Sequence, residues 1–507
     1  MIVMSLPELS AVELRRLIGS RQISPVELMD ACIDRIEKIN PAINAICATD
    51  FDGARAGAKQ AEAAVMRGDT LGLLHGLPLG VKDLQDTKGL LTTYGNIGLR
   101  GNIPESDNSL IKRLRAVGAI VTAKTNVPDM GAGANSRNPV WGATGNPFNP
   151  TLNAGGSSGG SAAALATDML PICTGSDTGG SLRIPAALCG VVGMRPSPGM
   201  VPNDARPLGW SVISVLGPMG RNVADTAMLY AASTGTDLLD PLAFPVDAST
   251  LWPIKQLDLS KLRVGYTEDF GVCIVDQEMR RSFRKKIAAL APLVGSCEPI
   301  DLQLGDTDRA FDILRAESFV AAFADTWRLN PENLGPNIRA NMEISSSITL
   351  ADRAWAHLEQ TRVSRKFAQA FGHYDLILSP VTPVTPFPWT ELYATHVDGQ
   401  AMKNYYQWLA LTYVVTLATN PTISLPCGTD EHGMPFGLQI SGRLFSDGNL
   451  LAAAYAIEQA FAGDTEMTRP KPDLNALKAA HPELKSIVTH PPIYNGDKKI
   501  AGMKTAV

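Results

Sequence analysis

From residue 77 onward, short apolar runs alternate with helical segments, and this alternation constrains the fold more than any other feature of the chain. The apolar runs cover residues 79–82, 119–124 and 170–174, and Gly or Pro residues punctuate them. Runs of this length without polar alternation are typical of strands that are buried on both faces of a sheet. Because the helical segments 109–117 and 161–169 lie between these runs, the pattern predicts an α/β fold.

The N-terminal part of the chain predicts helices instead of strands. Ser10 and Ser24 are each followed three residues later by a glutamate, which is the pattern of a capping box at a helix start. An alanine-rich stretch at 53–67 predicts a third helix. We therefore expect residues 1–68 to form a helical region that packs on the core.

The rest of the chain divides by pattern into one large unit and a tail. Residues 69–463 are expected to form the main α/β domain, with a mainly helical and variable insert at about 222–372. Polar and proline-containing sequence predicts a C-terminal tail over residues 464–507. The expected elements from the insert onward are helices at 276–293, 306–329, 350–371 and 449–461, and strands at 264–266, 376–378, 422–425 and 437–440.

Composition argues against several classes of protein. The net charge of −5 and the pI near 5.9 give no electrostatic reason to expect a nucleic-acid partner. No apolar stretch reaches 18 residues, so we expect no membrane partner. The seven cysteines are scattered and never spaced as C-x-x-C, which indicates neither a disulfide framework nor a zinc site. The chain is therefore predicted to be a cytoplasmic globular protein.

Two glycine-rich segments with embedded serines carry the chemical signal. Residues 153–161 read NAGGSSGGS, and residues 175–185 read GSDTGGSLRIP. Glycines allow backbone N–H groups to approach a ligand closely, and a run of such groups can hold a developing negative charge. A serine at the end of such a run can attack a carbonyl while the N–H groups stabilise the oxyanion.

A serine hydroxyl needs a base, because it is a poor nucleophile at neutral pH. The seven histidines lie in no motif that is directed at a serine. Lys82 ends an apolar strand, in a place where a surface lysine is not expected. A buried lysine can act as a base because desolvation disfavours its charged form.

Other interpretations of these motifs compete with this one. Residues 155–159 satisfy G-x-S-x-G, but that nucleophile elbow needs a preceding strand, and residues 149–153 predict a turn. Ser109 and Lys112 match S-x-x-K without the accompanying motifs, which indicates a capped helix with a surface lysine. A flexible linker is the plainest alternative for residues 155–161, but the apolar sequence beside them favours burial.

The chain resembles the amidase signature family in three segments that follow one another in the order of that family's catalytic blocks. These are the Lys82 segment, the GGSSGG run and the GSDTGGSLRIP segment. Further matches extend the resemblance over roughly residues 5 to 462. The resemblance implies a single large domain with a central mixed β-sheet that helices cover on both faces. It also implies a hydrolase that acts on carbon–nitrogen bonds other than peptide bonds, with no metal and no cofactor.

The resemblance also implies roles for individual residues. Ser181 would be the nucleophile and Lys82 the base, while Ser157, joined by a cis peptide to Gly156, would pass the proton between them through an acyl-enzyme cycle. The backbone N–H groups of Thr178, Gly179, Gly180 and Ser181 would form the oxyanion hole. Ser158, Asp177 and Arg183 would support the site from behind.

The substrate is the least specified part of this interpretation. Residues expected to contact it are Met130, Gly131, Trp141 and Trp210, and their character favours a small, neutral and hydrophobic amide. A carbamate or aryl-acylamide hydrolase with the same triad, with an esterase side activity, is an alternative. The glutaminase subunit of a tRNA-dependent amidotransferase is a more distant one, and a non-catalytic binding protein would normally have lost one of the three residues. A homodimer is a possible assembly.

Overall fold

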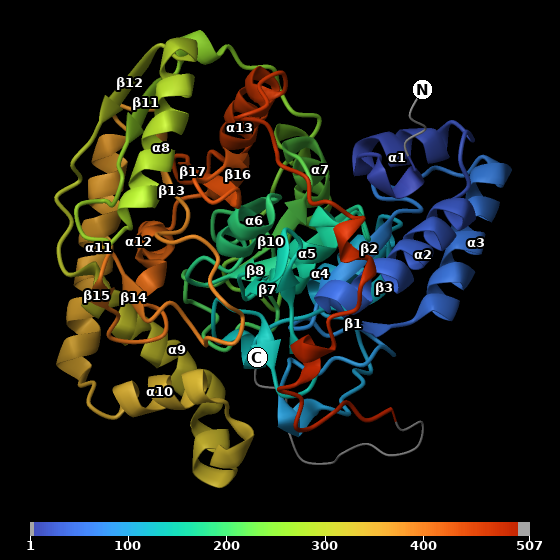
Figure 1. Ribbon diagram of the computed structural model, residues 1–507, viewed down its shortest axis with the longest axis horizontal. Coiled ribbons are helices and arrows are strands. Elements are labelled where there is room, and N and C mark those ends of the chain that lie inside the picture. Colours follow the sequence, from blue (N-terminus) through green and yellow to red (C-terminus); the bar gives the residue numbers. More distant parts are fainter. Residues whose placement is uncertain (1–4, 495–507) are drawn as a thin grey trace.

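The computed structural model describes residues 5–494, and its centre is one mixed, 11-stranded β-sheet (Figure 1). Parallel pairs such as β2 with β3 occur beside antiparallel pairs such as β16 with β17. The α/β class and the mixed sheet predicted for the chain are thereby confirmed. Across the sheet, the strands are β1 (Ile46–Thr49), β3 (Ile120–Thr125), β2 (Pro78–Lys82), β8 (Ile172–Asp177), β10 (Val215–Gly220), β9 (Val192–Arg195), β16 (Thr422–Thr429), β17 (Pro435–Ser441), β13 (Leu376–Pro380), β11 (Arg263–Tyr266) and β12 (Ser296–Pro299).

Thirteen α-helices surround this sheet within the described residues. In Figure 1, α1 to α3 lie at one end of the molecule, while α8 to α11 lie at the opposite end. The helices are α1 (Ala11–Gly19), α2 (Pro25–Ile43), α3 (Phe51–Arg67), α4 (Ser109–Ala116), α5 (Gly159–Ala166), α6 (Arg183–Cys189), α7 (Val223–Ser233), α8 (Gln277–Leu290), α9 (Thr307–Leu329), α10 (Pro336–Ser345), α11 (Leu350–Ala370), α12 (Ala410–Ala418) and α13 (Asp447–Phe461).

The N-terminal region contains the expected helices and one strand that was not expected. Ser10 accepts a hydrogen bond from the Glu13 N–H, and Ser24 forms a complete capping box with Glu27. After α2, the chain adds β1 to the edge of the sheet, antiparallel to β3. Residues 1–68 are therefore not wholly helical, because this strand joins them to the central sheet.

The insert between about residues 222 and 372 is mainly helical, as predicted, and it also extends the sheet. Strand β11 pairs in parallel with β13 and with β12. The segment of β12 had not been predicted as a strand, since it is short, half exposed and contains a proline. The long helices α9 and α11 pack against each other beside this edge of the sheet.

The C-terminal segment packs back on the domain as far as the structure describes it. Leu484 has no exposed surface, and the Ile493 N–H donates to the carbonyl of Arg100. The remaining part of the predicted tail, residues 495–507, lies outside the described residues. Within the described part of the chain, no helix is long and apolar enough to cross a membrane.

Candidate active site

The central sheet brings Lys82 and the two glycine-rich segments together. Lys82 is the last residue of β2, which runs parallel to β8 in the middle of the sheet. Ser157 lies in the loop before α5, and Ser181 lies in the loop that follows β8. Helix α5 is buried along its whole length, so its glycines and alanines allow the Ser157 loop to pack closely against the sheet. The carboxyl ends of two neighbouring strands therefore converge on one site.

The Lys82 side chain is completely buried, and its amino group is hydrogen-bonded to Ser157. Its Nζ lies 2.7 Å from the Ser157 Oγ and 2.9 Å from the Ser176 Oγ, and the side chain has no exposed surface. Burial lowers the pKa of Lys82 to about 7, although the charge of nearby Asp177 partly opposes this shift. A large fraction of the Lys82 side chains is therefore neutral at neutral pH and able to accept a proton.

A second buried lysine, Lys124, has a carboxylate neighbour that Lys82 lacks. Lys124 on β3 is equally buried, but its Nζ lies 4.0 Å from a carboxylate oxygen of Asp83 and 3.1 Å from the Thr87 hydroxyl. Burial lowers the pKa of Lys124 to about 8, while Asp83 favours the charged form. Within the described residues, Lys82 has no carboxylate within 4.0 Å and bonds only to hydroxyl and carbonyl oxygens.

Sequence reasoning missed two side chains of β8 that support this lysine. Ser176 accepts from the Lys82 Nζ, and the Thr174 hydroxyl accepts from the Lys82 backbone N–H at 3.0 Å. Both lie on the same side of the strand, because side chains alternate along β structure. Two polar residues at alternate positions of an otherwise apolar run were the available signal.

The two serine loops are tied together through their backbones. The peptide bond between Gly156 and Ser157 is cis, as the family resemblance implied. The Ser158 N–H donates to the Ser181 carbonyl at 3.2 Å, while the Ser158 hydroxyl is buried with no hydrogen-bond partner in the described part of the chain. Ser181 itself is half-buried, and its hydroxyl forms no hydrogen bond within residues 5–494. Of the hydroxyls of Ser157, Ser158 and Ser181, only that of Ser157 is therefore hydrogen-bonded within the described part of the chain.

Asp177 shapes the loop that ends at Ser181. Its carboxylate accepts hydrogen bonds from the N–H groups of Gly180 and Leu182 and forms ion pairs with Arg183 at 3.0 Å and Arg195 at 3.2 Å. Burial alone would raise the pKa of Asp177, but the two guanidinium groups hold it below its usual range. The side chain of Arg195, absent from the set of supporting residues inferred from the sequence, belongs to this network.

This geometry changes the expected set of oxyanion donors. The Gly180 N–H is already donated to Asp177 at 2.9 Å, so it is not free for a substrate oxygen. The N–H groups of Thr178, Gly179 and Ser181 form no hydrogen bonds among the described residues. Gly180 has a φ of +127°, and a Cβ there would lie 2.3 Å from the Thr412 hydroxyl oxygen, so its role is to make the turn.

Both serines open into one cavity of about 190 Å³, which Thr178 and Gly179 also line. Met130 and Gly131 line it as predicted, whereas Trp141 and Trp210 do not. The Trp141 indole donates to the Thr93 hydroxyl instead, and Trp210 is 78% exposed. Side chains that the sequence did not indicate complete the wall, among them Arg206, Arg315, Phe319, Phe323 and Leu409.

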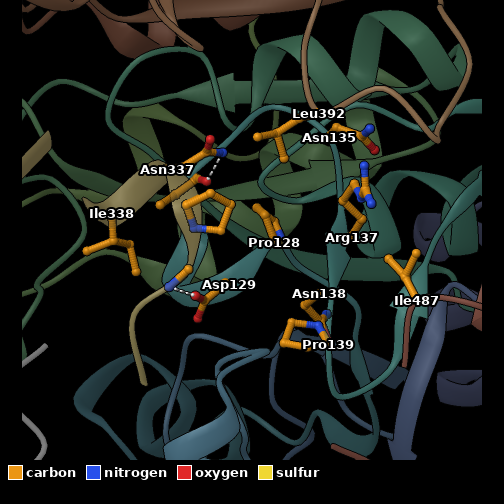
Figure 2. A pocket seen from close by; sticks show the side chains of 13 residues that line it. Pro128, Asp129, Asn135, Arg137, Asn138, Pro139, Asn337, Ile338, Leu392 and Ile487 are labelled. Carbon is orange, nitrogen blue, oxygen red and sulfur yellow. Dashed lines mark hydrogen bonds between the residues drawn. The ribbon is translucent and has the colours of Figure 1, made fainter. Parts of the chain in front are cut away.

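A second cavity, of about 230 Å³, is lined by Pro128 and Asp129 and by residues at the start of α10 (Figure 2). The Asp129 carboxylate there accepts from the Gly335 N–H at 2.7 Å, and the Asn337 amide donates to the Ala132 carbonyl at 2.8 Å. Neither Ser157 nor Ser181 lines this cavity. The contacts of Asp129 and Ala132 instead fasten their loop to the start of α10.

The turn predicted for residues 149–153 is wrong. Residues 149–153 are not a turn but strand β7 (Asn149–Asn153), which immediately precedes the G-x-S-x-G sequence. However, β7 pairs with β6 (Gly145–Asn146) in a separate two-stranded sheet, with one further bridge from Leu152 to Pro388, and does not belong to the central sheet. Since a nucleophile elbow follows a strand of the main sheet, that interpretation still fails, although for a different reason.

Comparisons with known proteins agree with this fold. The sequence profile of the Amidase family matches residues 27–451. A glutamyl-tRNA(Gln) amidotransferase subunit from Acaryochloris marina is 32% identical over 484 residues, which cover 90% of this chain and 98% of the relative. A bacterial aryl acylamidase of the amidase signature enzymes has a TM-score of 0.83 at 28% identity, over 94% of this chain and 99% of that one. 6-Aminohexanoate cyclic dimer hydrolase in complex with substrate has a TM-score of 0.81 at 26% identity, over 93% and 100%.

The names of these relatives overturn one prediction from the sequence. The acidic net charge was interpreted as excluding nucleic acid from the partners, yet the curated relatives belong to an amidotransferase named for a tRNA. That exclusion is wrong. Net charge averages over the whole surface, so it does not report what one face, or a neighbouring protein chain, can bring to this one.

Proposed function

The chain belongs to the amidase signature family, whose members are hydrolases of carbon–nitrogen bonds, and on that premise we propose that it cleaves a small amide with Lys82, Ser157 and Ser181. The observation that carries this proposal is the 2.7 Å contact between the Lys82 Nζ and the Ser157 Oγ. The lysine has no exposed surface, and burial lowers its pKa to about 7, so the neutral amine is well populated at neutral pH.

The reaction begins with proton transfer along the hydroxyls. Neutral Lys82 takes the proton of Ser157 as Ser157 takes the proton of Ser181, and Ser181 attacks the carbonyl carbon. Ser157 then protonates the leaving nitrogen, which departs as an amine, and Lys82 returns its proton to Ser157. Water hydrolyses the acyl-enzyme by the same relay in reverse and restores Ser181.

The developing oxyanion needs donors that are not already engaged. The free N–H groups of Thr178, Gly179 and Ser181 fit this role, because Asp177 holds the loop through Gly180 and Leu182. Fixed donors in a water-poor site are favourable because they need no reorganisation as charge develops. Asp177, Arg183 and Arg195 therefore position the loop and do not touch the substrate.

The cavity favours a substrate with an apolar body. Met130, Phe319 and Phe323 supply much of its wall, and the space of about 190 Å³ suits a small molecule. A carbamate would fit the same machinery, because its carbonyl carbon also carries a nitrogen leaving group.

A second candidate function follows from the curated relatives. The chain covers 98% of the length of one component of a tRNA amidotransferase, with 32% identity. In that role the chain would hydrolyse glutamine within a complex. It would then show little turnover of simple amides by itself.

A substrate panel tests the proposal and separates the two candidates. Wild type should cleave p-nitroanilides or primary amides unaided, and Ser181→Ala should reduce the rate by roughly 10⁴-fold or more. Ser233→Ala removes another buried serine, which bonds within α7, and should behave as wild type. The panel includes esters, carbamates and L-glutamine. The proposal fails if wild type cleaves none of the amides or carbamates, or if Ser181→Ala retains its rate.

A further inference from the structure

Arg315 on α9 is a buried cation at the wall of the active-site cavity. Its side chain is only 6% exposed, and it lines the same cavity as Ser157 and Ser181. The Nη2 donates to the Tyr405 hydroxyl at 2.6 Å, while the Nε is buried with no partner among the described residues. Guanidinium groups remain charged in proteins, so Arg315 cannot lose its charge on burial.

The other buried arginines of the described chain all have a carboxylate. Arg183 and Arg195 pair with Asp177, Arg206 with Asp240, and Arg221 with Asp168, at distances of 2.5 to 3.2 Å. Arg315 forms no ion pair within residues 5–494. A buried charge is costly unless it is paired and hydrogen-bonded. Arg315 therefore lacks the compensation that these four buried arginines have.

The surroundings of Arg315 supply aromatic faces instead of negative charge. Its guanidinium carbon lies 4.7 Å from the ring centre of Phe319, 5.1 Å from that of Tyr406 and 5.4 Å from that of Tyr405. Asp312, one turn earlier on α9, accepts the Tyr406 hydroxyl at 2.6 Å and lies beyond 4.0 Å from Arg315. Such faces orient a guanidinium but do not neutralise it.

The cavity supplies no counter-charge either. Its lining includes no aspartate and no glutamate, and its other guanidinium, Arg206, is already paired with Asp240 at 2.9 Å. Helix α9 also brings Arg315 close to the reacting loop, because Phe311, one turn before it, lies against Gly179: a Cβ at Gly179 would be 3.0 Å from that ring. A positive group with unused donors thus faces the space that the substrate occupies.

We propose that Arg315 binds a carboxylate of the substrate, so that the natural substrate is an amide acid with an apolar segment between its carboxylate and its scissile bond. The inference rests on the proposed function and replaces the neutral substrate expected from the sequence. The planar fork of Arg315 offers a carboxylate two parallel N–H donors, and Phe319 and Phe323 cover the apolar segment.

Paired substrates test this proposal. Glutaryl-p-nitroanilide is compared with its neutral carboxamide isostere, which tests a carboxylate on the acyl side. N-butyryl-4-aminobenzoate is compared with N-butyryl-4-aminobenzamide, which tests a carboxylate on the amine side. In wild type, the acid of at least one pair should have a kcat/KM roughly 10- to 100-fold above that of its neutral partner, as expected for a charge-assisted hydrogen bond.

Arg315→Met should remove most of this preference, lowering the acid-to-neutral ratio by roughly the same factor. Arg309→Met is the matched control, because Arg309 lies on the same helix, is half exposed and pairs with Asp352. It should keep the wild-type ratio. Butyrate should also inhibit cleavage of a neutral amide competitively in wild type, with an inhibition constant at least about 10-fold weaker in Arg315→Met.

The outcomes distinguish a failure of the proposed role of Arg315 from a failure of the proposed function. If wild type cleaves neutral amides through Ser181 but prefers the neutral member of both pairs, the role of Arg315 is refuted and the proposed function stands. The same holds if Arg315→Met lowers both members of a pair equally, since that would indicate a structural role through Tyr405. If wild type cleaves neither pair nor any amide of the wider panel, the proposed function itself fails.

Discussion

Amide cleavage should rise with pH through a midpoint near 7, because the proposed base is neutral Lys82 and its pKa is lowered to about 7. The group must lose a proton before it can accept one from Ser157. The value of kcat/KM reports the ionisation of the free enzyme. We therefore expect kcat/KM to fall about tenfold for each pH unit on the acid side of pH 6 and to level off above pH 8.

The magnitude follows from the burial of this lysine. Lowering the pKa from 10.5 to about 7 corresponds to about 5 kcal/mol of lost preference for the charged form. At pH 7, about half of the Lys82 side chains would be neutral, against roughly one in 3,000 for an unperturbed lysine. The structure contains no carboxylate within 4.0 Å of the Lys82 Nζ in its described part, so little opposes this shift beyond the more distant Asp177.

The assay is release of p-nitroaniline at constant ionic strength from pH 5.5 to 9.5, with Ser181→Ala as the background. Other groups titrate nearby: burial also raises the pKa of Asp129, beside the second cavity, to about 7. Asp129→Asn is therefore the control, and it should leave the midpoint in place. A rate that does not change between pH 5.5 and 9, or a midpoint near 10, would refute a neutral Lys82 as the base.

Two further predictions concern the relay and the loop. Lys82→Ala should reduce amide cleavage by about 10²- to 10⁴-fold more than cleavage of the matched ester, since an amine leaving group must be protonated and an alkoxide less so; equal losses in steady-state assays would contradict the relay. Asp177→Asn should lower the free energy of unfolding by about 3–5 kcal/mol in urea titrations, because it leaves Arg183 and Arg195 without their counter-charge. Asp447→Asn, at a buried carboxylate held by Ser197 and Tyr230 and by no arginine, should cost clearly less, and equal losses would argue against the charge explanation.

Local chemistry made much of the fold predictable. The helix starts at Ser10 and Ser24 are encoded within four residues, and the buried strands near Lys82 are continuous apolar runs. By contrast, β1 and β12 were missed because edge strands have half-exposed, irregular sequences whose pairing depends on a partner far away in the chain. The strand β7 was missed for a related reason, since its residues are typical of a turn and become a strand through pairing with β6 and a bridge to Pro388.

The candidate site likewise contains residues that the sequence predicts and residues that it does not. Lys82, Ser157 and Ser181 lie in motifs that can be recognised locally, whereas Arg315 and Phe319 come from α9, more than 130 residues after Ser181. The two tryptophans were selected by their character alone, and the fold directs them elsewhere: Trp141 bonds to Thr93 and Trp210 faces solvent. Residue type indicates what can line a pocket, but only the packing of distant helices decides which residues do.

The cations around this cavity show how one low-polarity environment produces two different functions. Lys124, Arg183, Arg195 and Arg206 each have a carboxylate within 4.0 Å, so burial leaves them as fixed structural charges. Lys82 and Arg315 have none in the described part of the chain. Lysine can avoid the cost of desolvation by releasing its proton, which makes it a base, whereas arginine cannot release its proton. The same absence of a counter-charge that activates Lys82 therefore leaves Arg315 dependent on an anion from outside the chain, and the bound substrate is the molecule that the cavity admits there.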